Sequence, residues 1–362
     1  MKKRYWLLLV VFVAVLGWNA RAIIGHWIMV DHWVALVADV DHRMKPGDFP
    51  DLNSDNIRSL REASSIRDGD FNIIVLGDSY VFGFLHRNAD TAPPAQLEHW
   101  LREHYRTDRI NVWNFGWTSS SPYLSLRLLK DIGAKYHPDL VILNLDMTDF
   151  KDDFFYRQLI EGNGLYHYVK QYPRLFFHIK GLFAGVPFLR PLHQRWFGYP
   201  ADGDYFVTRQ PQQDSLRYFA GVRESLDQIN AYSRDVLHAP FVVMLPPRHW
   251  QYTDKESPDS WEQGLFDVMG PHALEPFHYF EGVGPMLDYP VISLLSDFRE
   301  TNQFPLNFKG DSHWTPAGAR FAAQAIARHC FDIGCFDELN SRFAAAPDVG
   351  LEAVVPELAP VP

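Results

Sequence analysis

The chain has 362 residues, 47% of them hydrophobic and 15% aromatic, so it is long and apolar enough to bury one sizeable core. Its formal net charge is −10 and no basic stripe is visible. Binding to nucleic-acid phosphates needs clustered Lys and Arg. We therefore expect a globular protein that has no nucleic-acid partner.

The N-terminal segment, residues 1–37, has the pattern of a signal peptide or a membrane anchor. The basic residues 2–4 precede an almost uninterrupted apolar stretch from Tyr5 to Trp18. That stretch is shorter than the ~20 residues that a spanning helix prefers, and Ala20-Arg21-Ala22 resembles a signal cleavage site. Because apolar sequence continues to Val37, an uncleaved inner-membrane anchor with a cytoplasmic positive end is favoured over cleavage and secretion to the periplasm. Both place the folded domain outside the cytoplasm, and a buried start helix of a cytosolic protein is the third alternative.

Beyond this segment, short apolar runs alternate with stretches whose apolar residues have helical spacing. Near-continuous apolar runs are typical of parallel strands that are buried on both faces. The alternation therefore predicts an α/β fold in which helices cover both faces of a central parallel sheet. The predicted strands are 72–76, 110–114, 140–145, 241–245 and 291–295, and the predicted helices are 94–105, 122–135, 216–237 and one that starts at residue 316.

The first of these strands runs into the tripeptide Gly77-Asp78-Ser79. A serine in a turn after a buried strand is exposed at the carboxyl edge of a parallel sheet, where α/β proteins carry out their chemistry. Gly, Asp and Ser are also common turn residues, so the tripeptide alone does not identify a nucleophile. Its interpretation depends on finding the partners of a triad elsewhere in the chain.

An acidic cluster follows the third predicted strand. It contains Asp146, Asp149, Asp152 and Asp153. A divalent metal site is one interpretation, but hard cations usually have a denser set of oxygen ligands. We expect instead a solvated loop and a helix start, where negative charge suits the helix dipole. The sequence thus predicts no metal and no cofactor.

The stretch 154–206 interrupts the strand–helix alternation with many aromatic residues and prolines. It could be a helical cap that stacks sugar rings or receives an acyl chain. It could also face a membrane, with Lys and Arg flanks that snorkel. The third possibility is an ordinary insertion with its own small core.

A second candidate loop lies near the other end of the chain, at Asp311-Ser312-His313-Trp314. Thr315 and Pro316 are suited to the N-cap and first position of the helix that follows. An aspartate two residues from a histidine can fix the tautomer of the imidazole while the other ring nitrogen faces a nucleophile. Two such loops in one α/β chain favour a serine, histidine and aspartate triad.

The C-terminal part contains the two cysteines of the chain, Cys330 and Cys335. In an exported protein they are expected to form a small disulfide that closes a short loop, with two free thiols as the alternative. The tail, residues 341–362, has no periodicity and is rich in Pro and Ala, so we expect it to be disordered.

These blocks resemble the SGNH (GDSL-like) hydrolase superfamily, and most of all its bacterial envelope O-acetyltransferases and polysaccharide esterases. The resemblance covers roughly residues 70 to 330 and is specific only in the combination of its short motifs. The matching blocks are Gly77-Asp78-Ser79-Tyr80, Asn114-Phe115-Gly116 and Asp311-Ser312-His313-Trp314-Thr315-Pro316-Ala317-Gly318. The remaining block departs from the family pattern, with Asp146 in place of a glycine and Thr148 in place of the oxyanion asparagine.

The resemblance implies a three-layer α/β/α sandwich over residues 38–340, with the aromatic-rich stretch 154–206 as an insertion or cap. It also implies that Ser79 is the nucleophile, His313 the general base and Asp311 the residue that orients the histidine. The implied oxyanion hole consists of the backbone N–H groups of Ser79 and Gly116, with the Thr148 hydroxyl as a third donor of shorter reach.

We therefore expect an envelope-located serine esterase or O-acyltransferase that acts on acyl groups, mainly O-acetyl groups, of an exported or cell-surface polysaccharide. The expected partners are the acylated polysaccharide, the inner membrane and, for transfer, a membrane acyl-transfer protein. One alternative is a lipid or thioester acyl hydrolase. The other is a non-catalytic, membrane-anchored glycan-binding subunit with a degenerate SGNH fold, which Asp146 and Thr148 favour.

Overall fold

The computed structural model describes residues 51–161 and 203–343, together with residues 5–6, 9–14, 17, 34–37, 41–44 and 49. Most of the N-terminal segment 1–37 lies outside the described residues, as do residues 162–202 of the predicted insertion. The sequence expectations for a cap, for signal cleavage and for residues 344–362 of the tail therefore stay predictions.

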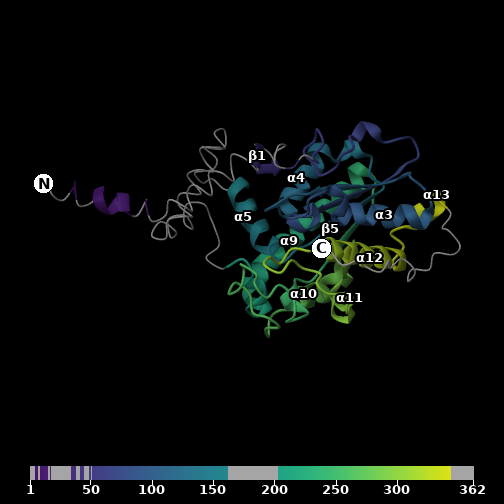
Figure 1. The fold of residues 1–362 in the computed structure, drawn as a ribbon. Coiled ribbons are helices and arrows are strands. Elements are labelled where there is room, and N and C mark those ends of the chain that lie inside the picture. Colours follow the sequence, from purple (N-terminus) through teal and green to yellow (C-terminus); the bar gives the residue numbers. More distant parts are fainter. Residues whose placement is uncertain are drawn as a thin grey trace.

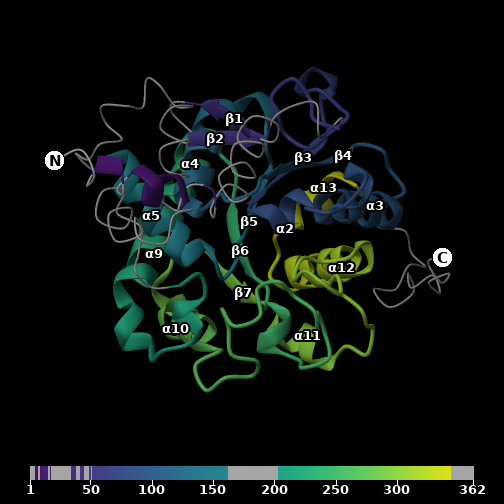
Figure 2. The same ribbon diagram turned by 60° about the vertical axis from the view of Figure 1, so that its left-hand side comes forward.

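Figure 1 shows a central sheet with helices packed around it. The sheet has five parallel strands in the order β4-β3-β5-β6-β7 (Figure 2). The chain begins the sheet at β3, adds β4 on one side and then builds β5, β6 and β7 on the other. The predicted α/β fold with a parallel sheet is thus confirmed. The strands are β3 (Phe71–Gly77), β4 (Ile110–Gly116), β5 (Leu140–Asn144), β6 (Phe241–Leu245) and β7 (Val291–Ser293).

Helices cover both faces of this sheet, and each face has its own apolar core (Figure 2). Side chains alternate between the faces along β3, so Ile74 belongs to one core while Ile73 belongs to the other. The first face carries α4 (Pro122–Ile132), α5 (Asp149–Glu161) and α9 (Leu216–Tyr232). The second face carries α3 (Pro93–Tyr105) and α12 (Pro316–Asp332), which pack against each other.

Shorter elements surround the edges of the sheet. They are α2 (Ser79–Phe82), α10 (Glu275–Val283), α11 (Leu295–Glu300), α13 (Asp337–Arg342) and an antiparallel pair, β1 (Val34–Val37) with β2 (Asp41–Met44). Residues 341–343, which we assigned to a disordered tail, belong to the folded body. Arg342 in α13 pairs with Asp139 at 2.6 Å and donates to the Asp70 carbonyl at 3.1 Å.

The two cysteines are free thiols in the structure, which corrects the expectation of a disulfide. Cys330 lies in the last turn of α12, and the Cys335 backbone N–H donates to its carbonyl oxygen at 2.9 Å. The two thiols meet through a hydrogen bond, and this bond, together with burial, raises the pKa of Cys330. The local turn is therefore closed by hydrogen bonds without a covalent link.

Candidate active site

Ser79 begins α2 directly after the carboxyl end of β3. The Asp78 side chain caps this helix, because its Oδ1 accepts the Tyr80 backbone N–H at 2.9 Å. The helix packs on the end of β4, where a Cβ atom at Gly116 would come within 2.6 Å of the Phe82 backbone nitrogen. Glycine at position 116 is thus required for the nucleophile helix to sit directly on the sheet.

The other end of α2 is held by the buried Arg58. Its guanidinium donates to the carbonyl oxygens of Phe82 at 3.0 Å, Gly83 at 2.6 Å and His86 at 2.8 Å, and it pairs with Asp51 at 3.1 Å. The last carbonyls of a helix have no intrahelical partner, and a cation there is favourable. Arg58 therefore fixes the short helix that presents Ser79.

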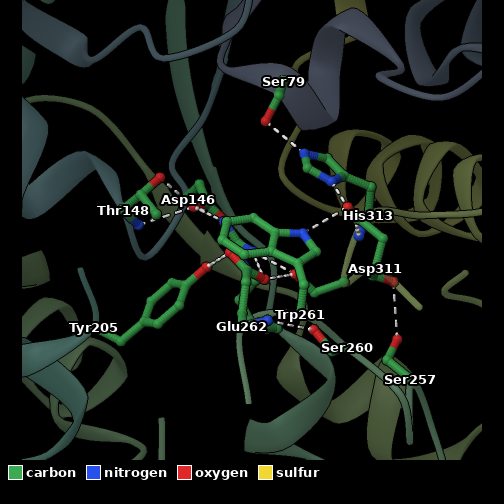
Figure 3. Close-up of polar contacts among 12 residues, drawn as sticks. Ser79, Asp146, Thr148, Tyr205, Ser257, Ser260, Trp261, Glu262, Asp311 and His313 are labelled. Carbon is green, nitrogen blue, oxygen red and sulfur yellow. Dashed lines mark hydrogen bonds and ion pairs between the residues drawn. The ribbon is translucent and has the colours of Figure 1, made fainter. Parts of the chain in front are cut away.

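The histidine loop meets this helix from the far end of the chain. His313 Nε2 lies 2.7 Å from Ser79 Oγ, and His313 Nδ1 bonds to the Asp311 carboxylate (Figure 3). The His313 backbone N–H also donates to Asp311, at 2.9 Å. Although burial raises the pKa of Asp311, its hydrogen bonds and charge interaction with His313 outweigh that effect and hold the pKa below its usual range. The structure thus links the three predicted triad residues by hydrogen bonds that run from Ser79 through His313 to Asp311.

Tyr80 and His86 connect the serine and histidine loops. The Tyr80 hydroxyl donates to the Ser312 carbonyl, and its ring stacks on His313 with centroids 4.8 Å apart. His86 Nε2 lies 2.8 Å from the Trp314 carbonyl oxygen. These contacts fix the separation of the nucleophile and the imidazole.

The helix after the histidine loop begins as the sequence predicts. The Thr315 hydroxyl accepts the Gly318 N–H at 3.1 Å, and Pro316 is the first residue of α12. A Cβ atom at Gly318 would lie 2.1 Å from the Leu306 carbonyl oxygen. Glycine is needed there because two backbone segments approach each other closely.

Two of the three predicted oxyanion donors already have acceptors. The Gly116 N–H donates to Asn114 Oδ1 at 3.0 Å. The Thr148 N–H and hydroxyl both donate to Asp146 Oδ2, at 2.9 and 2.7 Å. The Ser79 N–H belongs to the first turn of α2, where helix N–H groups lack intrahelical acceptors. In this arrangement the Gly116 N–H is turned to Asn114 and the Thr148 hydroxyl to a carboxylate, whereas the Ser79 N–H lies at a helix N-terminus.

Asp146 forms a buried ion pair beneath the site, where we expected a solvated loop. Arg248 Nε and Nη2 bind its two carboxylate oxygens at 2.7 and 2.6 Å, and both side chains are 3% exposed. Burial raises the pKa of Asp146, but the Arg248 charge and the hydrogen bonds from Arg248 and Thr148 together outweigh burial and leave the pKa below its usual value. The family glycine position is thus occupied by one half of a buried salt bridge.

Arg248 contacts both the serine loop and the histidine loop of the site. Its guanidinium donates to Ser312 Oγ at 2.9 Å and lies over the Tyr80 ring, 4.5 Å from the centroid. Glu262 completes the cluster, because it accepts bonds from the hydroxyls of Ser312 and Tyr205 (Figure 3). The sequence analysis missed Arg248, although it follows β6 at the same edge of the sheet as Ser79.

Two further carboxylates of this region are buried and carry raised pKa values. Burial, reinforced by the charge of Asp146, raises the pKa of Asp78 to about 8. Burial and the charges of Asp78 and Asp146 raise the pKa of Asp149 well above its usual value. Asp149 and Asp153 are 1% and 0% exposed, so the acidic cluster is buried and the expectation of a solvated loop was wrong.

Trp261 is a second residue that the sequence analysis missed. Its indole Nε1–H donates to Asp311 Oδ2 at 2.9 Å, on the side of the carboxylate away from His313 (Figure 3). The side chain is nevertheless 67% exposed. Its segment, residues 257–264, carries no motif that would have identified it.

The described residues contain no group of three or more His, Cys, Asp or Glu side chains that could hold a metal ion. Within the same part of the chain, no helix is both long and apolar enough to cross a membrane. The expectations of no metal and no cofactor stay predictions.

Comparison with known proteins gives one family match. Residues 286–344 match the SGNH hydrolase-like domain of the acetyltransferase AlgX. This segment contains Asp311, His313 and the start of α12. The search among curated proteins gives no match.

Several solved structures show weak likenesses. A catalytic mutant of Axe2, an acetylxylan esterase from Geobacillus stearothermophilus, is 14% identical, with 71% of this chain and 93% of that chain covered and a TM-score of 0.39. LAE5, an α/β hydrolase from the metagenome of Lake Arreo, Spain, is 14% identical, with coverages of 73% and 95% and a TM-score of 0.39. A two-domain esterase active on acetylated mannans is 10% identical, with coverages of 75% and 50% and a TM-score of 0.39. Similarities this low carry no inference about the substrate.

The family match covers the histidine loop, and the serine loop that completes the motif set lies at hydrogen-bond distance from it. Both loops emerge at the carboxyl edge of a parallel sheet with helices on both faces. The segment that carries the histidine loop is therefore similar to the SGNH hydrolase-like domain of an acetyltransferase.

Proposed function

We propose that Ser79, His313 and Asp311 are the catalytic triad of an acyl esterase or O-acyltransferase whose substrate is an O-acetylated exported or cell-surface polysaccharide. The observation that carries this proposal is the hydrogen-bond sequence from Ser79 Oγ through the two ring nitrogens of His313 to Asp311. That order of groups lets a serine hydroxyl act as a nucleophile near neutral pH.

In the first half-reaction, Ser79 Oγ attacks the carbonyl carbon of the acetyl ester while His313 Nε2 takes the hydroxyl proton. The tetrahedral intermediate collapses, and the same proton passes to the leaving sugar oxygen, which leaves an acetyl group on Ser79. Asp311 keeps Nδ1 protonated and stabilises the imidazolium that forms. Water or a second sugar hydroxyl then attacks the acetyl-serine, and His313 again transfers the proton.

The oxyanion of the intermediate needs donors that are aimed at it. We assign this role to the Ser79 N–H, and to the Gly116 N–H when it turns from Asn114 to the substrate. Thr148 would have to release Asp146 before its hydroxyl could become a third donor. Each missing donor typically costs ~100-fold or more in rate, so a slow enzyme is expected unless another donor enters with the substrate.

The proposed location is the outer side of the inner membrane, with the N-terminal segment as anchor or signal. The described apolar residues of this segment are exposed: Tyr5 63%, Trp6 64%, Val10 60% and Val13 58%. Apolar side chains in such a row are suited to a lipid environment. Alkaline carbonate extraction of membranes should leave an anchored chain in the pellet, whereas recovery of uncleaved chain in the cytosol would overturn the proposal.

The activity test uses the full-length chain in detergent. The wild type should release p-nitrophenol from p-nitrophenyl acetate, and Ser79→Ala and His313→Ala should each lower kcat by at least about 10³-fold. Equal background rates in all three proteins would overturn the enzyme proposal and favour a glycan-binding subunit.

A preference for p-nitrophenyl octanoate over acetate would favour a lipid substrate. Acetylation of an added oligosaccharide would show transfer.

A further inference from the structure

We propose that Trp261 is the wall of a substrate subsite that stacks a pyranose ring next to the triad, and that its indole N–H positions Asp311 at the same time. The proposal deepens the proposed function and rests on it. Two observations support it. The Trp261 side chain is 67% exposed, and its indole N–H donates to the Asp311 carboxylate at 2.9 Å.

The exposure of Trp261 does not come from a loose loop. Its neighbours Ser260 and Glu262 are 4% and 7% exposed, so the chain on both sides of the ring is buried. The Trp261 backbone N–H donates to the Gly310 carbonyl at 3.3 Å, and the Ser257 hydroxyl donates to the Asp311 carbonyl at 3.1 Å. An anchored loop thus displays one large aromatic face to solvent.

The orientation of the ring is also fixed. A tryptophan N–H that is bonded to a carboxylate can rotate little without breaking a charge-assisted hydrogen bond. The neighbouring Glu262 points inward and accepts the Ser312 hydroxyl, so two consecutive side chains hold both sides of the histidine loop (Figure 3). A pre-organised ring loses little conformational entropy when a ligand stacks on it.

The chemistry around the ring favours a sugar over an acyl chain. Lys309 and Asp259 form an exposed ion pair at 3.2 Å on the two segments that carry the triad aspartate and Trp261. Their side chains are 79% and 63% exposed, so their charged groups can exchange water for ligand hydroxyls. A pyranose has an apolar C–H face and a hydroxyl rim, which match one aromatic face with a polar border. An acyl chain would need a continuous apolar wall.

The positioning role predicts a direction for the pH profile. Without the indole N–H, Asp311 loses one donor and its charge becomes more available to the imidazolium. Trp261→Phe, which keeps an aromatic face but has no N–H, should lower kcat on p-nitrophenyl acetate about tenfold. It should also move the acidic limb of the kcat/KM profile to higher pH, a shift that a merely structural role would not produce.

The stacking role is separated from the positioning role by Trp261→Ala. On acetylated xylo-oligosaccharide this variant should raise KM at least about tenfold above that of Trp261→Phe, while the two variants should have similar KM for p-nitrophenyl acetate. Met286→Ala, which removes another exposed apolar side chain (65% exposed), should match the wild type on both substrates. Equal saccharide KM in the Phe and Ala variants would overturn the stacking role, and an unmoved pH profile in Trp261→Phe would overturn the positioning role.

Binding is measured apart from catalysis in the Ser79→Ala background. Calorimetric titration with pentasaccharides of xylose, mannose, glucose and N-acetylglucosamine should give at least one that binds about tenfold more weakly when Trp261→Ala is added. If none of the four shows this loss, the subsite is overturned, whatever the hydrolase assay gives. If the subsite binds but the wild type hydrolyses no ester, the proposed function fails while the subsite stands.

Discussion

Asp78 links the acidity of a single buried side chain to the stability of the whole protein. Its pKa is raised to about 8 by burial, whereas the ordinary value is 3.8. Between these two values the folded state keeps a proton that the unfolded chain releases. The free energy of unfolding therefore falls as pH rises through this window, by up to about 1.4 kcal/mol per pH unit for one such group.

We predict that Asp78→Asn flattens this fall. Asparagine keeps the Oδ1 acceptor for the Tyr80 N–H but cannot ionise. Urea unfolding at several pH values from 5 to 8 should show a smaller slope of the free energy of unfolding against pH than in the wild type. The exposed Asp90→Asn serves as the matched control and should keep the wild-type slope. Identical slopes for Asp78→Asn and the wild type would contradict a raised pKa at Asp78.

The sequence identified the residues whose signal is local. Ser79, Asp311 and His313 lie close to strong strand or helix patterns in the sequence, so their spacing carries information. Trp261 and Arg248 act across the chain, on groups 50 and 102 residues away in sequence. No local pattern encodes such pairings. The same limit explains why the burial of Asp146 was not predicted. The acidic run around Asp146 gives no sign that Arg248, far away in the sequence, pairs with this carboxylate.

Helix α2 has only four residues, so its geometry depends on the contacts at its two ends. A single turn of helix has little stability of its own. Asp78 supports the first end, and Arg58 supports the second by donating to three carbonyl groups. Ser79 is thus held in place mainly by tertiary contacts.

We predict that Arg58→Met lowers the free energy of unfolding by about 3 kcal/mol, because it leaves the Asp51 carboxylate and three carbonyl groups without their buried partner. Arg58→Met combined with Asp51→Asn should recover part of this loss, since the uncompensated charge is gone. Arg234→Met provides the control, because it breaks a surface pair whose side chains are both 59% exposed, and it should leave the midpoint close to that of the wild type. Urea midpoints measure all three, and an Arg58→Met midpoint equal to that of Arg234→Met would contradict the role of Arg58.

At the scale of elements, the sequence predicted the strands better than the helices. Each of the five predicted strands exists, because these apolar runs are too short for a typical helix and are bounded by turn residues. The predicted helix 216–237 ends as α9 at Tyr232 and continues as a π-helical turn, Ser233–Leu237. Helices α10 and α11 were missed, since they have only 9 and 6 residues, too few for a clear amphipathic period.

The arrangement of the whole molecule explains why the site is where it is. The sheet starts at β3 and grows in both directions from it, so the end of β3 is the point where the strand order reverses. Crevices at such points are the preferred ligand sites of open parallel sheets. Ser79 occupies this point, and the histidine loop reaches it from 234 residues further along the chain. The fold class follows from the alternation of elements, whereas this meeting of distant loops follows only from the strand order.

The central claim is that His313 activates Ser79 as a nucleophile, and covalent labelling tests it most directly. The full-length chain is treated with a fluorophosphonate, which bonds to activated serines, and the product is analysed by intact mass and peptide mapping. We predict one adduct per chain, located at Ser79, and a labelling rate at least about 10³-fold lower in His313→Ala. An adduct on another residue, or equal labelling rates in the wild type and His313→Ala, would contradict the account.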